Sequence, residues 1–116
     1  MPSVRIYHNP ACSKSRAALD LLRSNGVQPE IVEYLRQPPD AATIAGLLDL
    51  LGLEPRQILR REEAEYAALG LDDPALDRDH LIAVLATHPR LLQRPIVVAG
   101  GRAVIGRPPE AVLDLL

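Results

Sequence analysis

The sequence predicts an α/β fold in which a four-stranded mixed sheet is built in two halves, β-α-β and later β-β-α, with a mostly helical insertion between them. Three observations support this: a strand pattern followed by a helical repeat near the N-terminus, a Leu-rich helical middle block, and two β-branched runs joined by Gly-Gly near the C-terminus. The length of 116 residues is that of one domain. The net charge of -2 argues against nucleic-acid binding driven by bulk positive charge.

The first half begins with a strand over Val4–His8, because β-branched and aromatic residues dominate there and Asn9-Pro10 interrupts the run. A helix is expected from Ser13 to the stop signal Asn25-Gly26, and a second strand over Ile31–Tyr34. Two strands joined in this way by a helix should be parallel, with a right-handed crossover. The apolar residues of the helix recur at helical spacing, at Ala17, Ala18, Leu21 and Leu22.

The middle block, residues 38–89, reads as mostly helical. Asp40 and Asp77 are suitable N-caps for two longer helices, and Gly52 is placed to end the first of them. Pro55 favours another short helix between the two, because proline is tolerated in a first helical turn.

The C-terminal segment predicts an antiparallel hairpin and a final helix. Ile96–Val98 and Ala103–Ile105 are β-branched runs, and Gly100-Gly101 between them permits the positive φ angles of a tight turn. Pro109 is placed to open the final helix. The residues expected on the buried face of that helix are Val112, Leu113 and Leu116.

This order of elements is the thioredoxin-like arrangement. We expect one domain over 1–116, with a thioredoxin-like core formed by about 1–37 and 90–116 and the helical insertion over about 38–89. Hydrophobic residues make up 47% of the chain, yet Phe and Trp are absent, so the core should be aliphatic. Because many functions share this fold, the chemistry has to be argued from individual residues.

The chain has a single cysteine, Cys12, which excludes an internal disulfide and a Cys-rich zinc site. It stands where the first strand meets the first helix. There, free backbone N–H groups and the helix dipole favour a thiolate, and Lys14, Arg16 and His8 can each add positive potential. Such a residue is a candidate nucleophile. The alternative is a small buried apolar side chain, a common role for free cysteine.

Ser15 occupies the position where a dithiol enzyme with a CxxC motif has its second cysteine. If Cys12 is redox-active, the resolving thiol must therefore come from another molecule, such as glutathione or a second protein. Ser15 could donate a hydrogen bond to the Cys12 thiolate, or it could be an ordinary first-turn serine that satisfies the backbone.

Arginine is the main cation of the chain, and its planar fork suits tetrahedral oxyanions. Arg94 precedes Pro95 at the start of a predicted strand, which makes a cis peptide bond plausible there, and Arg107 follows the second hairpin strand. Arg60 ends a short apolar turn. Composition does not separate these three from Arg56, Arg61 and Arg90.

Three segments together resemble the glutaredoxin-coupled arsenate reductase family, whose fold is thioredoxin-like. They are Ile6–Arg16, Arg94–Val97 and Gly106–Glu110, and the similarity also includes Ile58-Leu59-Arg60 and the stretch Tyr66–Leu71. The similarity runs along essentially the whole chain and is greatest to a short cytoplasmic branch of the family. The cysteine loop is the specific part of this signal, since Arg-Pro pairs alone would be weak.

The resemblance implies that Cys12 is the nucleophile and that His8 and Ser15 stabilise its thiolate. The residues that it implies as ligands of the oxyanion and of the arsenical intermediate are Arg60, Arg94 and Arg107. It further implies thiol-dependent reduction of arsenate to arsenite, with glutathione as co-substrate and glutaredoxin as the partner that resolves the mixed disulfide. No bound cofactor and no metal are implied.

Two other functions remain open. A sister group of the same family binds RNA polymerase as a regulator, although its members often carry a CxxC motif that this chain lacks. The chain could also be a thiol oxidoreductase that acts on another oxyanion or on a glutathione adduct. Because the sequence has neither a secretion signal nor an apolar run of membrane length, we expect a cytoplasmic protein without a membrane partner. We further expect a monomer, and the charge balance argues against a nucleic-acid partner.

Overall fold

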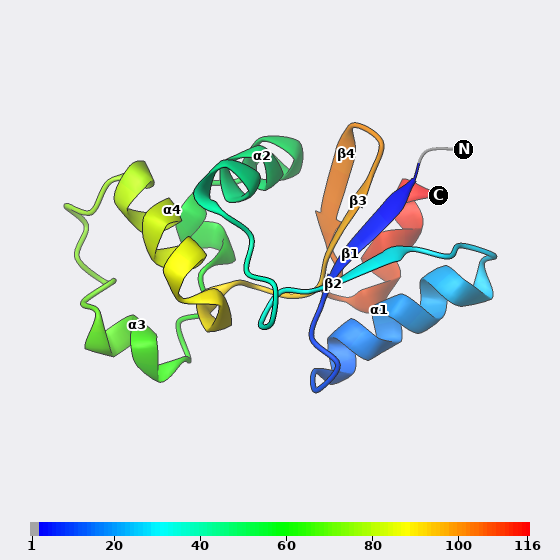
Figure 1. Cartoon of the computed structure of the whole chain (residues 1–116), viewed down its shortest axis with the longest axis horizontal. Helices are drawn as coiled ribbons and strands as arrows, with labels where there is room; N and C mark the ends of the chain where they lie inside the picture. Colours follow the sequence, from blue (N-terminus) through cyan, green and yellow to red (C-terminus); the bar gives the residue numbers. More distant parts are fainter. Residues whose placement is uncertain (1–2) are drawn as a thin grey trace. The chain divides into compact units, whose positions relative to one another are not determined.

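The computed structural model describes residues 3–116, and the chain divides into two compact units (Figure 1). The first unit combines the segment up to Gln37 with Arg94–Leu116, and the second is Pro38–Gln93. The predicted insertion ended at residue 89. The observed unit extends four residues further because the segment after the last helix turns back and Leu92 forms an isolated β-bridge with Leu59.

The first unit contains the sheet, whose strands are β1 (Val4–His8), β2 (Glu30–Glu33), β3 (Ile96–Ala99) and β4 (Arg102–Ile105). Their order is β2-β1-β3-β4. β1 pairs with β2 in parallel, and the pairs β1–β3 and β3–β4 are antiparallel. This is the mixed four-stranded sheet that the sequence predicts, with β1 in the centre.

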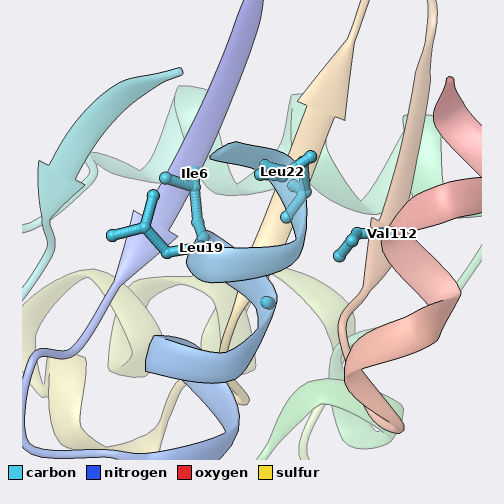
Figure 2. Packing of buried hydrophobic residues seen from close by; sticks show 6 residues of the cluster. Ile6, Leu19, Leu22 and Val112 are labelled. Atoms are coloured by element: carbon cyan, nitrogen blue, oxygen red, sulfur yellow. The ribbon is translucent and has the colours of Figure 1, made fainter. Parts of the chain in front are cut away.

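Helix α1 (Ser13–Ser24) packs on the sheet and forms the core of this unit (Figure 2). Its turns bring Ala18, Leu19 and Leu22 against Ile6 of β1, as expected for an amphipathic helix that covers one face of a sheet. The core is aliphatic, as predicted, and two further residues complete it: Val97 of β3 and Val112 near the C-terminus.

Two predictions in the C-terminal segment need correction. Only Gly100 of the Gly-Gly pair has a positive φ angle, +60°, so Gly101 does not need the glycine conformation that was expected of it. The final helix, η3 (Pro109–Leu115), is 3₁₀ rather than α. A 3₁₀ helix repeats every three residues, which puts Pro109 and Val112 on the buried face. Leu113 and Leu116 are exposed, contrary to the prediction.

The second unit is helical, with α2 (Ala41–Leu51), η1 (Pro55–Ile58), α3 (Ala64–Ala68), α4 (Arg78–Thr87) and η2 (Pro89–Leu91). Both predicted N-caps are confirmed: the Asp40 side chain accepts from the Thr43 N–H, and that of Asp77 accepts from the His80 N–H, at 2.8 Å in each case. Gly52 ends α2 with φ +68°. The short helix α3 was not predicted.

Side chains as well as helix packing tie the second unit together. The Arg56 guanidinium donates to the carbonyl oxygens of Leu71 and Asp73, and the Tyr66 hydroxyl donates to the Asp72 carboxylate at 2.7 Å. The three tyrosines of the chain are all buried. Tyr7 and Tyr34 belong to the first unit, and Tyr66 belongs to the second.

Candidate active site

The loop that follows β1 places Cys12 at the N-cap of α1. The Asn9 side chain accepts the Ala11 N–H, the Asn9 carbonyl accepts the Cys12 N–H, and Arg16 donates to the Pro10 carbonyl. These short-range bonds fix the loop, and the Arg16 N–H completes the first helical turn by donating to the Cys12 carbonyl at 3.0 Å. The Cys12 side chain is 8% exposed, so the thiol is at the margin of the core.

The electrostatic surroundings of the thiol only partly match the prediction. Cys12 occupies the N-cap position, where the positive end of the helix dipole favours an anion, yet its side chain makes no capping hydrogen bond. Lys14 and Arg16 are exposed within the first turn and a half of the helix. They contribute positive potential through solvent, which screens such charges.

His8 and Ser15 form a buried pair on either side of this loop. The His8 Nδ1 atom lies 2.6 Å from the Ser15 hydroxyl oxygen, which also accepts the Asn9 N–H at 3.1 Å. Ser15 is fully buried, and His8 is 6% exposed. The serine therefore links the end of β1 to the first turn of α1, and its bond from the Asn9 N–H is the backbone-satisfying role that the sequence left open.

Burial lowers the pKa of His8 below 6.5, and nearby Arg16 and Arg23 act in the same direction, while the Glu33 carboxylate opposes them. The imidazole is therefore neutral near pH 7. Burial therefore works against the positive potential that the sequence suggested for His8, and the contact that the ring makes is the hydrogen bond with Ser15.

The direction of that hydrogen bond decides what Ser15 can offer to Cys12. If the Ser15 hydroxyl donates to Nδ1, its one proton is used. If the neutral ring carries its proton on Nδ1, the ring donates to Ser15 and the hydroxyl proton is free to turn towards the sulfur. A neutral His8 allows both arrangements, so the tautomer of His8 controls whether Ser15 can stabilise a thiolate.

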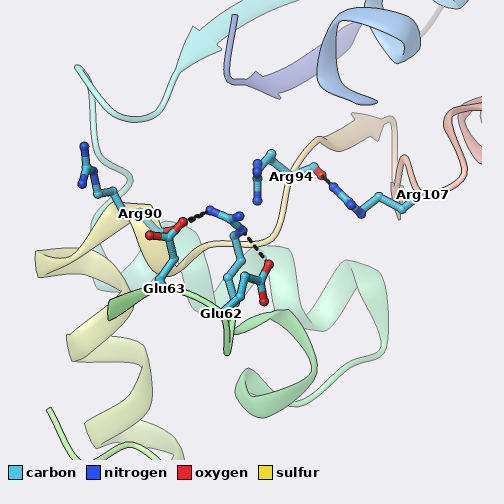
Figure 3. A network of polar contacts seen from close by, with 6 residues as sticks. Glu62, Glu63, Arg90, Arg94 and Arg107 are labelled. Atoms are coloured by element: carbon cyan, nitrogen blue, oxygen red, sulfur yellow. Dashed lines mark hydrogen bonds and ion pairs between the residues drawn. The ribbon is translucent and has the colours of Figure 1, made fainter. Parts of the chain in front are cut away.

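Arg94 and Arg107 flank the same end of the sheet as the cysteine loop. Tyr7 pairs with Ile96 and Ile96 pairs with Ile105, so the end of β1, the start of β3 and the end of β4 meet there. The Arg107 guanidinium donates to the Arg94 carbonyl at 3.3 Å (Figure 3). The Arg94-Pro95 peptide is cis, as the sequence suggested, and so is Arg107-Pro108, which was not anticipated.

Gly106 lies between β4 and Arg107, at a position where the structure leaves no room for a side chain. Its N–H donates to the Pro95 carbonyl at 2.9 Å, and a Cβ placed on it would lie 2.7 Å from the Pro95 Cγ and 3.3 Å from the Ala18 Cβ. The absence of a side chain therefore lets the segments that carry Arg94 and Arg107 approach each other and α1. A glycine between a strand and an Arg-Pro pair was the available signal.

Arg60 belongs to the second unit and has different surroundings. Its side chain is 13% exposed and forms ion pairs with Glu63 and with Glu62 (Figure 3). Its guanidinium also donates to the Arg90 carbonyl at 3.4 Å. The first unit thus holds Cys12, together with the four other site candidates His8, Ser15, Arg94 and Arg107. The carboxylate partners of Arg60 were not identified from the sequence.

No group of three or more His, Cys, Asp or Glu side chains within residues 3–116 is arranged to hold a metal ion. None of the helices in that range has the length and apolar character of a transmembrane span.

A mixed sheet in this order, with a lone cysteine at the N-cap of the first helix, defines a thioredoxin-like protein with a one-cysteine site. More specifically, the chain belongs to the ArsC family, which it matches over residues 7–115. It is 49% identical to an arsenate reductase of Neisseria meningitidis over the full length of both chains. It is also 52% identical to the uncharacterized protein YfgD of Escherichia coli, over 97% of this chain and 96% of that protein.

The solved structures agree with this family assignment. The arsenate reductase of Vibrio cholerae superposes with a TM-score of 0.97 at 47% sequence identity, covering 99% of this chain and 98% of that one. The predicted α/β, thioredoxin-like fold class and the resemblance to the arsenate reductase family are therefore both confirmed.

Proposed function

We propose that this chain reduces arsenate to arsenite through a single nucleophilic cysteine, Cys12, with glutathione and glutaredoxin as the resolving thiols. The observation that carries the proposal is the placement of one thiol at the N-cap of α1, beside the end of the sheet where Arg94 and Arg107 meet. Full-length similarity to proteins named arsenate reductase supports arsenate reduction in general.

In the proposed first step, the Cys12 thiolate attacks arsenic, a sulfur–arsenic bond forms, and one arsenate oxygen leaves as water after taking up protons. Arg94 and Arg107 would bind the remaining oxygens, because a guanidinium fork matches the geometry and charge of an oxyanion. Arg60 is proposed as a further ligand of the oxyanion.

In the second step, a glutathione thiolate attacks the Cys12 sulfur. The sulfur–arsenic bond breaks, its electron pair remains on arsenic, and arsenite is released as As(V) becomes As(III). The mixed disulfide between Cys12 and glutathione is then reduced by glutaredoxin, which restores the thiol. The electrons come from thiols, so the proposal requires no bound cofactor. A cytoplasmic location, where glutathione is reduced, and action as a monomer are parts of the same proposal.

His8 and Ser15 are proposed to stabilise the Cys12 thiolate as one unit. Ser15 would donate a hydrogen bond to sulfur, and His8, in the tautomer with its proton on Nδ1, would donate to Ser15 and orient it. The distance of 2.6 Å between Nδ1 and the Ser15 oxygen supports this coupling.

The test is a coupled assay with the purified chain, arsenate, glutathione, glutaredoxin and glutathione reductase, in which NADPH consumption is followed. We expect consumption that depends on arsenate and is abolished in Cys12→Ser. A fully reduced wild-type chain that consumes no NADPH with arsenate would exclude the reductase proposal. A panel of other oxyanions and glutathione adducts in the same assay would then identify a different substrate.

A further inference from the structure

Lys14 is a charged residue beside the proposed nucleophile to which the proposed function gives no role. It is the only lysine of the chain and stands two residues after Cys12, at the second position of α1. Its side chain is exposed, and within residues 3–116 its ammonium group makes no hydrogen bond or ion pair. Arg16, the other nearby cation, is held by the loop, because its guanidinium donates to the Pro10 carbonyl at 2.8 Å. Lys14 is therefore the cation next to Cys12 that is available to a ligand.

The position of Lys14 is unfavourable for the helix. The first turn of a helix carries partial positive charge from its free N–H groups, so a cation there lowers stability. The first turn of α1 has no acidic residue that would compensate, whereas Arg23 in the last turn is a cation at the favourable end. Because the Lys14 side chain is exposed, packing does not offset this cost. A charge that stabilises neither its helix nor a neighbouring group is a candidate for binding a ligand.

Helix geometry directs the Lys14 side chain towards the cysteine loop. Side chains of an α-helix lean towards its N-terminus, so a helical residue covers the surface over the preceding turn. For Lys14 that turn carries Cys12, whose N–H donates to the Asn9 carbonyl and whose carbonyl accepts the Arg16 N–H, both at 3.0 Å. The loop is thus fixed, while the flexible stem of lysine lets its ammonium group adjust to an anion. A molecule that approaches the Cys12 sulfur therefore meets this positive charge.

We propose that Lys14 is a specificity-determining residue for the resolving thiol, and that it favours glutathione by pairing with a glutathione carboxylate during attack on the Cys12 sulfur. Glutathione carries two carboxylates and one ammonium group at neutral pH, so it is an anion even before its thiol ionises. An uncharged thiol has no group for Lys14 to bind and gains nothing beyond the general attraction of its thiolate. This inference rests on the proposed function, in which glutathione is the resolving thiol.

The test follows the attack on the Cys12 sulfur alone, without arsenate. Cys12, the single thiol of the chain, is first converted to its mixed disulfide with thiopyridine by reaction with dipyridyl disulfide. The glutathione thiolate then bonds to the Cys12 sulfur and the bond to the thiopyridine sulfur breaks. The electron pair of that bond leaves with thiopyridine, which takes up a proton and is detected by its absorbance. Mercaptoethanol, an uncharged thiol, gives the reference rate, because its thiolate experiences any general effect of Lys14 on the sulfur.

Lys14→Gln should slow the reaction with glutathione about two- to fivefold more than the reaction with mercaptoethanol, which is the loss expected for one exposed ion pair. Lys14→Arg should keep most of the wild-type rate, because it keeps the charge. Arg102→Gln is the matched control, since it removes an exposed cation from β4 and should change neither rate. Arg102 pairs with Ala99, and Ala99 pairs with Val4, so this control lies at the end of the sheet away from the cysteine loop.

The proposal is overturned if Lys14→Gln slows both thiols equally, if Arg102→Gln gives the same loss, or if high salt leaves the difference between the thiols unchanged. Thermal unfolding tests the argument from the helix: Lys14→Gln should raise the midpoint slightly, because a cation is removed from the first turn. A lowered midpoint would give Lys14 a structural role and would also contradict the inference. Because the exchange needs no arsenate, failure of the reductase assay and failure of this inference are separate results.

Discussion

His8 Nδ1 lies 2.6 Å from the hydroxyl oxygen of Ser15, and both side chains are buried on either side of the loop that carries Cys12. The hydroxyl accepts a backbone N–H from Asn9 as well, so one serine connects the strand end, the loop and the helix. We therefore expect a change at either residue to affect the reactivity of the Cys12 thiol.

Ser15→Ala should slow alkylation of Cys12 by iodoacetamide several-fold at pH 7, because the proposed hydrogen bond to the thiolate is lost. It should also lower the free energy of unfolding by about 1–3 kcal/mol, since the Asn9 N–H and the His8 ring lose a buried partner. Ser13→Ala is the control, because Ser13 is exposed on the first turn of the same helix. Equal alkylation rates in the two variants would exclude a role for Ser15 beside the thiol.

The depressed pKa of His8 predicts a pH dependence of stability. The unfolded chain takes up a proton at His8 near pH 6.5, and the folded chain does so only at a lower pH. Stability should fall as the pH drops below about 6.5, and this decline should stop once the pH is below the folded-state pKa. An NMR titration of the imidazole should give a midpoint below 6.5, and His8→Asn should flatten this part of the stability curve. A midpoint at or above 6.5 would contradict the neutral assignment.

Local signals in the sequence predicted most of the fold. Asp40, Asp77 and Gly52 act at helix ends through their own backbone and nearest neighbours, so a short window of sequence contains the relevant information. The exposure of Leu113 and Leu116 could not be predicted in the same way, because apolar spacing at the chain end fits both an α and a 3₁₀ helix. In the structure Val112 packs against the core, and the three-residue repeat of the 3₁₀ helix η3 puts Pro109 on the same buried face.

The part of the candidate site that lies within one sequence motif could be predicted. Cys12 and Ser15 follow from a single loop and helix start. The partners of Arg60 could not be predicted, because Glu62 and Glu63 resemble solvated surface charges in the sequence. Only the folded chain shows that both carboxylates pair with the Arg60 guanidinium. The neutral state of His8 depends on burial by distant segments, which no local pattern encodes.

Gly106→Ala should damage both stability and activity. The added Cβ would lie 2.7 Å from the Pro95 ring, so the segment that carries Arg94 has to shift. We expect a loss of about 1–3 kcal/mol in the free energy of unfolding, as for other overpacked positions, and a lower kcat/KM for arsenate. Gly46→Ala is the matched control: nothing lies near that position in α2, and alanine there should stabilise the helix by up to about 1 kcal/mol. Wild-type behaviour of Gly106→Ala would show that the contact relaxes freely.

Arg94→Lys should reduce kcat/KM for arsenate roughly tenfold, because an ammonium group cannot make the two parallel hydrogen bonds of a guanidinium. The fold should be unaffected, as judged by circular dichroism. Arg102→Lys makes the same substitution on β4, where the side chain is exposed, and should leave the kinetics unchanged. Matching kinetics for the two variants would place Arg94 among the surface charges.

The buried tyrosines give this chain a built-in optical reporter for each unit. With no Trp or Phe, the intrinsic near-ultraviolet fluorescence comes from tyrosine alone. Tyr7 and Tyr34 belong to the first unit and Tyr66 to the second, where its hydroxyl donates to Asp72 and its pKa is raised. In Tyr66→Phe the remaining emission reports only the unit that carries Cys12. Comparing its denaturation curve with that of the wild type would therefore show whether the two units unfold together, without an added label.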